Sequence, residues 1–149
     1  MEKRDAISGG NHAALWHGRF KEGPDAEAIA FETSIFVDER MAFDDIQGSK
    51  AHVAMLGESG IIPSDEASLI IKTLDSIADD LKNGTLQIDY SAEDIHSFIE
   101  GTLTDRIGEA GKKVHTGRSR NDQIALDERL YLRHAIPDLQ GRIITLIET

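Results

Sequence analysis

Apolar residues recur every three or four positions through most of this sequence, which is the period of one face of an α-helix. The clearest stripe lies within residues 64–83 and consists of Ala67, Ile70, Ile71, Leu74, Ile77, Ala78 and Leu81. No segment of useful length alternates apolar and polar residues as a half-buried strand does, and residues 85–89 are too few to establish a strand. The periodicity therefore predicts an all-α fold.

The expected helix ends follow from residues that cap helices. Ser64 is expected to cap the first residues of the clearest helix, and Gly84 follows its last turn, where a left-handed residue commonly ends a helix. Ser91 and Asp94 have the spacing of a capping box for a second helix. The apolar stripe of that helix consists of Ile95, Phe98, Ile99, Leu103 and Ile107, and His96 is expected to lie beside it and not in it.

Two further helical patterns complete the chain. In residues 38–57 the pattern consists of Met41, Ala42, Asp45, Ile46, Ser49, Val53 and Leu56. The last pattern begins near Ser119, which has capping-box spacing with Asp122, and continues to Thr149. One helix cannot bury so long a stripe alone, which predicts partner helices and self-association.

These patterns predict three parts. Residues 1–14 are expected to form a flexible tail, because they are polar and punctuated by glycine. Residues 15–115 are expected to form an N-terminal helical domain. Residues 116–149 are expected to form one long helix that packs against partner helices.

The charge balance excludes several classes of protein. With 27 acidic residues against 16 lysines and arginines, the chain lacks the broad basic face that a nucleic-acid partner requires. There is no cysteine, no apolar run long enough to span a membrane and no apolar secretory segment at the N-terminus. The six histidines are scattered without a metal-ligand spacing. We therefore expect a cytoplasmic protein without a metal or cofactor.

A cationic segment, KKVHTGRSRND at residues 112–122, stands out from this acidic background. It carries no acidic side chain before Asp122, and Gly117 permits a tight turn just ahead of the expected helix. Free backbone N–H groups at a helix start attract anions, and Arg118 and Arg120 can each bind a carboxylate or phosphate through two hydrogen bonds. The alternative is that the two arginines pair with the helix acids Asp122, Asp127 and Glu128. The segment predicts an anion site but does not name its ligand.

Several motifs together resemble the argininosuccinate lyase family of the fumarase/aspartase superfamily. They are LWHGRF (15–20), TSIFVDERM (33–41), DIQGSKAHVAML (45–56), EDIHSFIE (93–100) and GKKVHTGRSRNDQIALDERLYLR (111–133). His17 is a departure, because the family usually has glycine there. The resemblance implies all-helical homotetramers whose active sites combine segments of three subunits. It also implies that residues 116–149 begin the long helix of a central bundle, whose remainder lies outside this sequence.

The resemblance also implies a reaction, the reversible β-elimination of argininosuccinate to arginine and fumarate. A base removes a proton next to a carboxylate, and an acid protonates the guanidinium as the C–N bond breaks. The six residues that the resemblance places at the substrate are Ser34, His96, Arg118, Ser119, Arg120 and Asn121. The substrate carries three carboxylates, which would account for the cationic segment.

The family's acid/base histidine follows a threonine in a later segment, and its catalytic serine belongs to a later G-S-S-x-M-P-x-K loop. Neither motif occurs in these 149 residues, so no catalytic residue is expected in this chain and the chain alone is expected to be inactive. One alternative is a non-enzymatic, crystallin-like structural protein, since the lens delta-crystallins resemble this lyase. Another is a lyase of the same superfamily that acts on a different succinyl adduct.

Overall fold

The computed structural model describes residues 26–149. The predicted tail at 1–14 and the LWHGRF motif lie outside the described residues. The described elements are α1 (Ala26–Glu32), α2 (Ile35–Asp38), the 3-10 helix η1 (Glu39–Met41), α3 (Ala42–Glu58), α4 (Ser64–Asn83), α5 (Ile95–Ile107), the 3-10 helix η2 (Gly108–His115) and α6 (Arg120–Glu148). No strand occurs among residues 26–149, so the all-α prediction is confirmed there.

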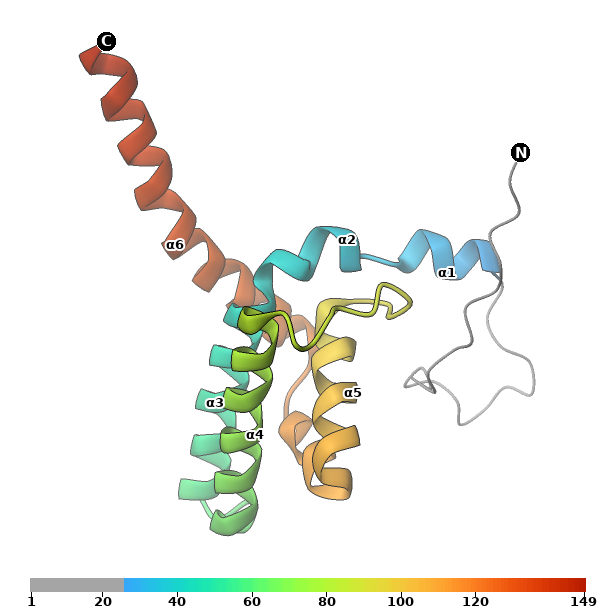
Figure 1. The fold of residues 1–149 in the computed structure, drawn as a ribbon. Helices are drawn as coiled ribbons and strands as arrows, with labels where there is room; N and C mark the ends of the chain where they lie inside the picture. The colour runs from blue at the N-terminus through green and yellow to red at the C-terminus, as the bar shows by residue number, and fades with distance from the viewer. Residues whose placement is uncertain (1–25) are drawn as a thin grey trace.

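Helices α3, α4 and α5 lie side by side and enclose the core (Figure 1). The helices α3 and α4 approach closely at Gly57, where a Cβ atom would lie 2.7 Å from Cβ of Ala67. The buried apolar residues are Ile35, Ala42, Ile46, Val53, Leu56, Ile62, Ala67, Ile70, Leu74, Ile77, Ala92, Ile95, Phe98, Ile99, Leu103 and Val114. Most of them come from the periodic stripes, so the predicted helix faces are the faces that pack.

The predicted ends of the middle helices are partly wrong. Gly84 ends α4 in the left-handed conformation, with φ of 72°, as expected. At the other end, Pro63 occupies the N-cap position and Ser64 is already helical, so Ser64 does not cap α4. Asp94 is itself the N-cap of α5 and accepts a 2.6 Å hydrogen bond from the backbone N–H of Ser97. Ser91 lies outside this cap, because Asp94 is closer to the orphan N–H groups of the first turn.

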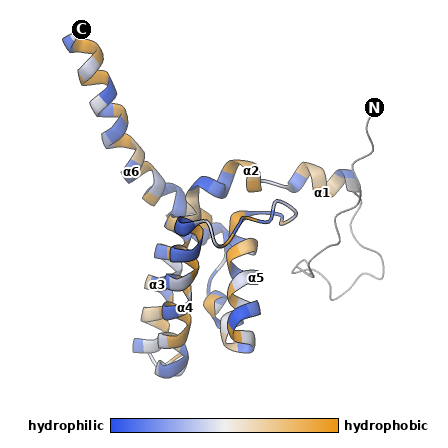
Figure 2. Ribbon diagram, viewed as in Figure 1, coloured by the Kyte–Doolittle hydropathy of each residue, from blue (hydrophilic) through white to orange (hydrophobic). Residues whose placement is uncertain are grey.

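Helix α6 leaves the helical core and extends away from it (Figure 1). It continues through Pro137 as one element, and its later turns expose Ile143, Ile144, Leu146 and Ile147 to between 48% and 77%. Apolar residues on the projecting half are visible in Figure 2. The described part of the chain therefore leaves this stripe unburied, as its length predicted. None of the helices in residues 26–149 combines the length and apolar character needed to cross a membrane.

The predicted capping box of α6 is present. The Ser119 hydroxyl accepts from the Asn121 N–H at 3.2 Å, and the Asp122 carboxylate accepts from the Ser119 N–H at 3.2 Å. We expect Ser119→Ala to lower the free energy of unfolding by about 1 kcal/mol, as the loss of a serine N-cap typically does. Urea unfolding measures this change. Ser68→Ala, within α4, is the control and should change stability by less than about 0.5 kcal/mol; an equal loss there would contradict the capping role.

Candidate anion site at the start of helix α6

The cationic segment forms a turn between η2 and α6. Gly117 adopts a left-handed conformation with φ of 65°, which glycine takes without the steric cost that a Cβ atom brings. The N–H of Arg118 donates to the carbonyl of His115 at 3.2 Å and closes the turn. Ser119 then caps α6. The predicted turn and helix start are therefore confirmed, and the N–H groups of the first helical turn lie beside two arginines.

Arg118 is held in place at one end of its guanidinium and is free at the other. Its Nη1 donates to the Ser49 hydroxyl on α3 at 3.0 Å. Its Nη2 is buried and has no hydrogen-bond partner among the described residues. A buried guanidinium nitrogen without an acceptor is costly, and because this atom is enclosed, an anionic ligand would reach it only once the Arg118 side chain turns outward.

Arg120 is already paired. Its Nη1 donates to Glu100 of α5 at 2.9 Å and to Gln123 at 2.8 Å, and its Nε lies 3.9 Å from an oxygen of Asp94. The acids that it contacts therefore come from α5 and its cap, and not from α6. Of the two arginines, Arg118 is the one with an unpaired donor in the part of the chain that the structure describes.

Ser34 lies at the N-terminus of α5, although it precedes α2 in the sequence. Its N–H donates to the carbonyl of Glu93 at 2.9 Å, and its hydroxyl donates to Asp38 at 2.6 Å. The other oxygen of Asp38 accepts from the N–H of Ile95 at 3.1 Å. Asp38 thus joins α2 to the first turn of α5, a role that sequence reasoning missed.

The exposed residues of the turn offer further polar groups. Ser119 uses its hydroxyl for the cap, whereas the side-chain amide of Asn121 makes no hydrogen bond to a described residue. The pKa of Asp122 is lowered by the hydrogen bond from the Ser119 backbone, with a smaller contribution from the charge of Arg118. Asp122 therefore stays ionised and caps the helix through the Ser119 N–H, and it makes no hydrogen bond to Arg118.

His96 is 1% exposed and lies in the core, so the prediction that it lies beside the buried stripe is wrong. Its Nδ1 lies 3.1 Å from Oδ1 of Asp45 and 3.3 Å from Oδ2 of Asp127. Both acids are fully buried, and Gln123, 1% exposed, donates to Asp45. We call Asp45, His96, Gln123 and Asp127 the buried polar cluster. It joins α3, α5 and α6, and it contacts the cationic turn because Gln123 accepts a hydrogen bond from Arg120.

Opposing effects set the pKa values in the buried polar cluster. Burial alone would raise the pKa of Asp45 and lower that of His96. Their mutual hydrogen bond and attraction outweigh burial, so the pKa of Asp45 is lowered and that of His96 is raised. For Asp127, burial and then the negative charge of Asp45 raise the pKa to about 8. The cluster therefore favours a charged pair of His96 and Asp45, and the pKa of about 8 keeps the carboxyl group of Asp127 mostly protonated at pH 7.

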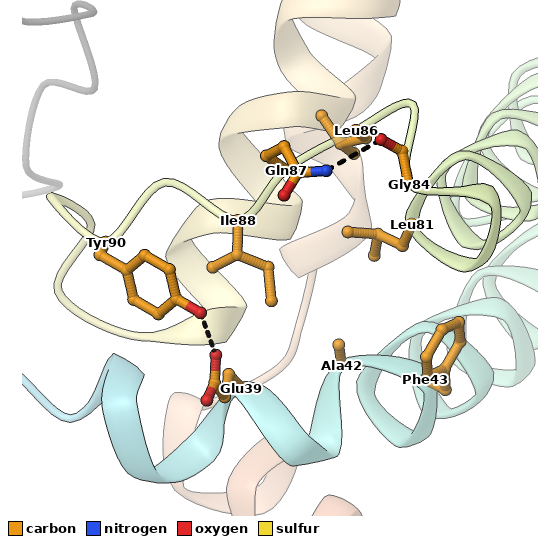
Figure 3. Close-up of a pocket in the computed structure, with 9 residues that line it drawn as sticks. All are labelled: Glu39, Ala42, Phe43, Leu81, Gly84, Leu86, Gln87, Ile88 and Tyr90. Atoms are coloured by element: carbon orange, nitrogen blue, oxygen red, sulfur yellow. Dashed lines mark hydrogen bonds between the residues drawn. The ribbon is translucent and has the colours of Figure 1, made fainter.

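A separate hollow of about 370 Å³ lies where the end of α4 and the following loop meet η1 and α3 (Figure 3). It is lined by Glu39, Ala42, Phe43, Leu81, Gly84, Leu86, Gln87, Ile88 and Tyr90. In Figure 3 the hydroxyl of Tyr90 points toward Glu39, to which it donates at 2.6 Å. None of the six residues predicted to bind substrate lines this hollow, so it is not part of the predicted anion site.

The chain is similar to several proteins named argininosuccinate lyase. It is 51% identical to that of Desulfitobacterium hafniense (strain DSM 10664 / DCB-2) over 135 residues, 53% to that of Clostridium beijerinckii over 134, and 48% to that of Methylococcus capsulatus over 132. The matches cover 89–91% of this chain and 28–29% of each relative's length. The resemblance seen in the motifs is therefore confirmed.

A comparison with protein families extends over almost the whole chain. The sequence model of the family described as Lyase matches residues 18–149. These residues include all six predicted substrate contacts, the buried polar cluster and the cationic turn. On the strength of this match, the chain belongs to the lyase family.

Proposed function

We propose that this chain forms part of an argininosuccinate lyase, a carbon–nitrogen lyase that converts argininosuccinate to arginine and fumarate in arginine biosynthesis. The support is the name shared by relatives 48–53% identical to it. Because the chain spans only about 29% of their length, the activity of the whole enzyme is carried over as a proposal. We also propose that it acts in the cytoplasm as a homotetramer, in which residues 116–149 begin the central helical bundle after the helical domain at 15–115.

The structural observation that supports a substrate site in this chain is the buried, unpaired Nη2 of Arg118 beside the start of α6. A carboxylate placed there would accept from Arg118 and from N–H groups at the positive end of the helix. Ser119 and Asn121, on the exposed side of the turn, would contact the same ligand. In this arrangement Arg118 binds one carboxylate of the succinyl group directly.

The other proposed site residues act around that contact. Arg120 is placed by Glu100, so a substrate carboxylate would have to share its guanidinium with that acid. Ser34 would present its hydroxyl from the start of α5, once it turns away from Asp38. His96 is buried, so its role is to orient neighbouring groups and not to contact substrate.

We propose that the residues that transfer protons belong to segments not found in residues 1–149, because neither the Thr-His motif nor the serine loop occurs in the sequence. The purified chain is therefore expected to release no fumarate from argininosuccinate, as followed by ultraviolet absorbance. Turnover that scales with protein concentration would contradict this division of the site. Binding of small dicarboxylates remains testable in the chain as it is.

Arg118→Ala tests the anion site. We expect it to weaken succinate binding by roughly 10- to 100-fold, because a hydrogen bond to a charged group contributes about 1.5–3 kcal/mol. Amide chemical shifts followed during a succinate titration give the affinity. Wild-type shifts should be largest at Gly117 and the first turn of α6.

Arg129→Ala is the matched control, since it removes an exposed arginine of the same helix and should leave the affinity unchanged. Arg118→Lys should recover part of the affinity, because it keeps the charge but loses the two-pronged geometry. Equal weakening in the Arg118 and Arg129 variants would show that the overall charge, and not a built site, attracts the ligand.

A further inference from the structure

The buried polar cluster has more acceptors than donors. Oδ1 of Asp45 accepts from His96 and from Gln123, whereas its Oδ2 has no hydrogen-bond partner among the described residues. Neither oxygen of Asp127 has one, although Oδ2 lies 3.3 Å from Nδ1 of His96. One carboxylate oxygen of Asp45, one of Asp127 and a ring nitrogen of His96 all lie within 4.8 Å of one another. Two buried carboxylates at this separation would repel each other and leave three acceptors unsatisfied.

One proton resolves this imbalance. A proton on Asp127 removes one negative charge and turns an orphaned acceptor into a donor within reach of the Asp45 carboxylate, since one oxygen of each acid lies within 4.8 Å of the other. The remaining charges are then a carboxylate on Asp45 and an imidazolium on His96, which attract each other. The exposure of the two acids is 0%, so bulk solvent does not hydrogen-bond to them.

The cluster and the anion site share the same two helices. Gly48 of α3 lets α6 approach, because a Cβ atom there would lie 2.9 Å from Cδ2 of Leu126 and 3.2 Å from Oδ1 of Asp127. The next residue, Ser49, accepts the hydrogen bond from Arg118. A shift of α6 relative to α3 at Asp127 would therefore also displace Arg118 from Ser49.

We propose that Asp127 is a positioning residue: in its protonated form it donates a hydrogen bond to Asp45, and this bond holds the start of α6 and Arg118 in place against α3 and α5. The proposal requires one proton on the carboxyl group of Asp127, shared with Asp45 through a hydrogen bond, and no chemical reaction. The expected effect on substrate binding through Arg118 rests on the function proposed above. The expected effect on the packing of α6 against α3 and α5 is independent of that function.

The proposal makes stability depend on pH with a definite sign. The pKa of Asp127 is about 8 in the folded chain, raised by burial and by the charge of Asp45, against 3.8 for an ordinary aspartate. Between these values the folded chain holds a proton that the unfolded chain has lost, so the stabilisation is complete below about pH 4 and declines as pH rises to about 8. The charged groups that act on the cluster besides Asp45 are His96 and Asp94 from α5 and Arg118 from the turn before α6.

The test compares the pH dependence of urea unfolding in the wild type and in Asp127→Asn. The asparagine amide can donate to Asp45 at every pH, as the protonated acid does. Relative to Asp127→Asn, the folding equilibrium constant of the wild type should fall by up to roughly tenfold per pH unit between about pH 5 and pH 8. Asp127→Ala should be less stable than Asp127→Asn throughout. Asp79→Asn, an exposed acid on α4, is the control and should follow the wild type.

Succinate affinity gives the second readout. Asp127→Asn should bind within about threefold of the wild type at pH 7, whereas Asp127→Ala should bind about tenfold more weakly because Arg118 loses its placement. If no variant and no wild-type sample binds succinate, the proposed function fails, and the unfolding data still decide the role of Asp127 in helix packing.

Three results would overturn the inference. The first is parallel pH dependence in the wild type and in Asp127→Asn, and the second is equal instability of the asparagine and alanine variants. The third is stabilisation of the wild type, but not of Asp127→Asn, by added Zn²⁺, which would make the cluster a cation site. Should the variants fail to fold, ¹³C-labelled aspartate in the wild type decides: one carboxyl resonance titrating near pH 8 supports the inference, and titration of all of them below pH 6 overturns it.

Discussion

Replacing Asp45 by alanine is expected to lower the free energy of unfolding by about 3–5 kcal/mol, the cost of removing one partner of a buried ion pair. Asp45 is 0% exposed and accepts hydrogen bonds from His96 and Gln123. Alanine removes the carboxylate that accepts from both His96 and Gln123, so two buried donors lose that acceptor. Urea or thermal unfolding of the variant at pH 7 measures the loss.

Asp75→Ala provides the matched comparison, because it removes the acid of an ion pair with Lys50 whose side chains are 54% and 34% exposed. Exposed pairs contribute about 0–1 kcal/mol, so this variant should remain close to the wild type. Asp45→Asn should fall between the two, since its amide oxygen still accepts from Gln123. A loss at Asp45 no larger than that at Asp75 would mean that the buried polar cluster does not hold the helices together.

Leu74→Ala is the second large change, with an expected loss of about 2–5 kcal/mol. Leu74 is 0% exposed in α4 and belongs to the core enclosed by α3, α4 and α5. Alanine removes buried apolar surface and leaves a cavity that the surrounding helices fill only in part. Denaturant unfolding measures this loss, provided that the dependence of the unfolding free energy on denaturant concentration is the same in the variant and the wild type.

Leu69→Ala on the same helix is its control. Leu69 is 43% exposed, so the same truncation there should cost well under half as much. The comparison holds helix propensity constant, because both changes replace leucine by alanine inside α4. Equal losses at the two positions would place the core on a different face of α4.

Much of the candidate site was predictable from local signals. Gly117, the Ser119–Asp122 box and the two arginines are adjacent in sequence, and turn and cap geometry depends on near neighbours. The partner of Arg120 was not predictable, because Glu100 lies 20 residues earlier and reaches it through the packing of α5. The contact between Arg118 and Ser49 spans 69 residues and has the same origin.

The sequence contains one local sign of the buried polar cluster. Asp45 falls among the apolar positions of the pattern at 38–57, and a charged residue on a buried face requires a partner. The pattern could not identify that partner, since His96 and Asp127 lie on other helices. Helical spacing predicts His96 beside its stripe, because spacing does not show which neighbouring helix covers a position.

By itself, the sequence determined the helical fold class, most core positions, the turn at Gly117 and the resemblance to argininosuccinate lyases. These properties depend on periodicity, on local backbone geometry or on motif identity, all of which are written in consecutive residues. Only the tertiary structure decided that Arg118 keeps an unpaired nitrogen while Arg120 is paired, and that Asp45, His96 and Asp127 meet in the core. Such pairings depend on how three helices pack, because burial and charge act between side chains that are distant along the chain.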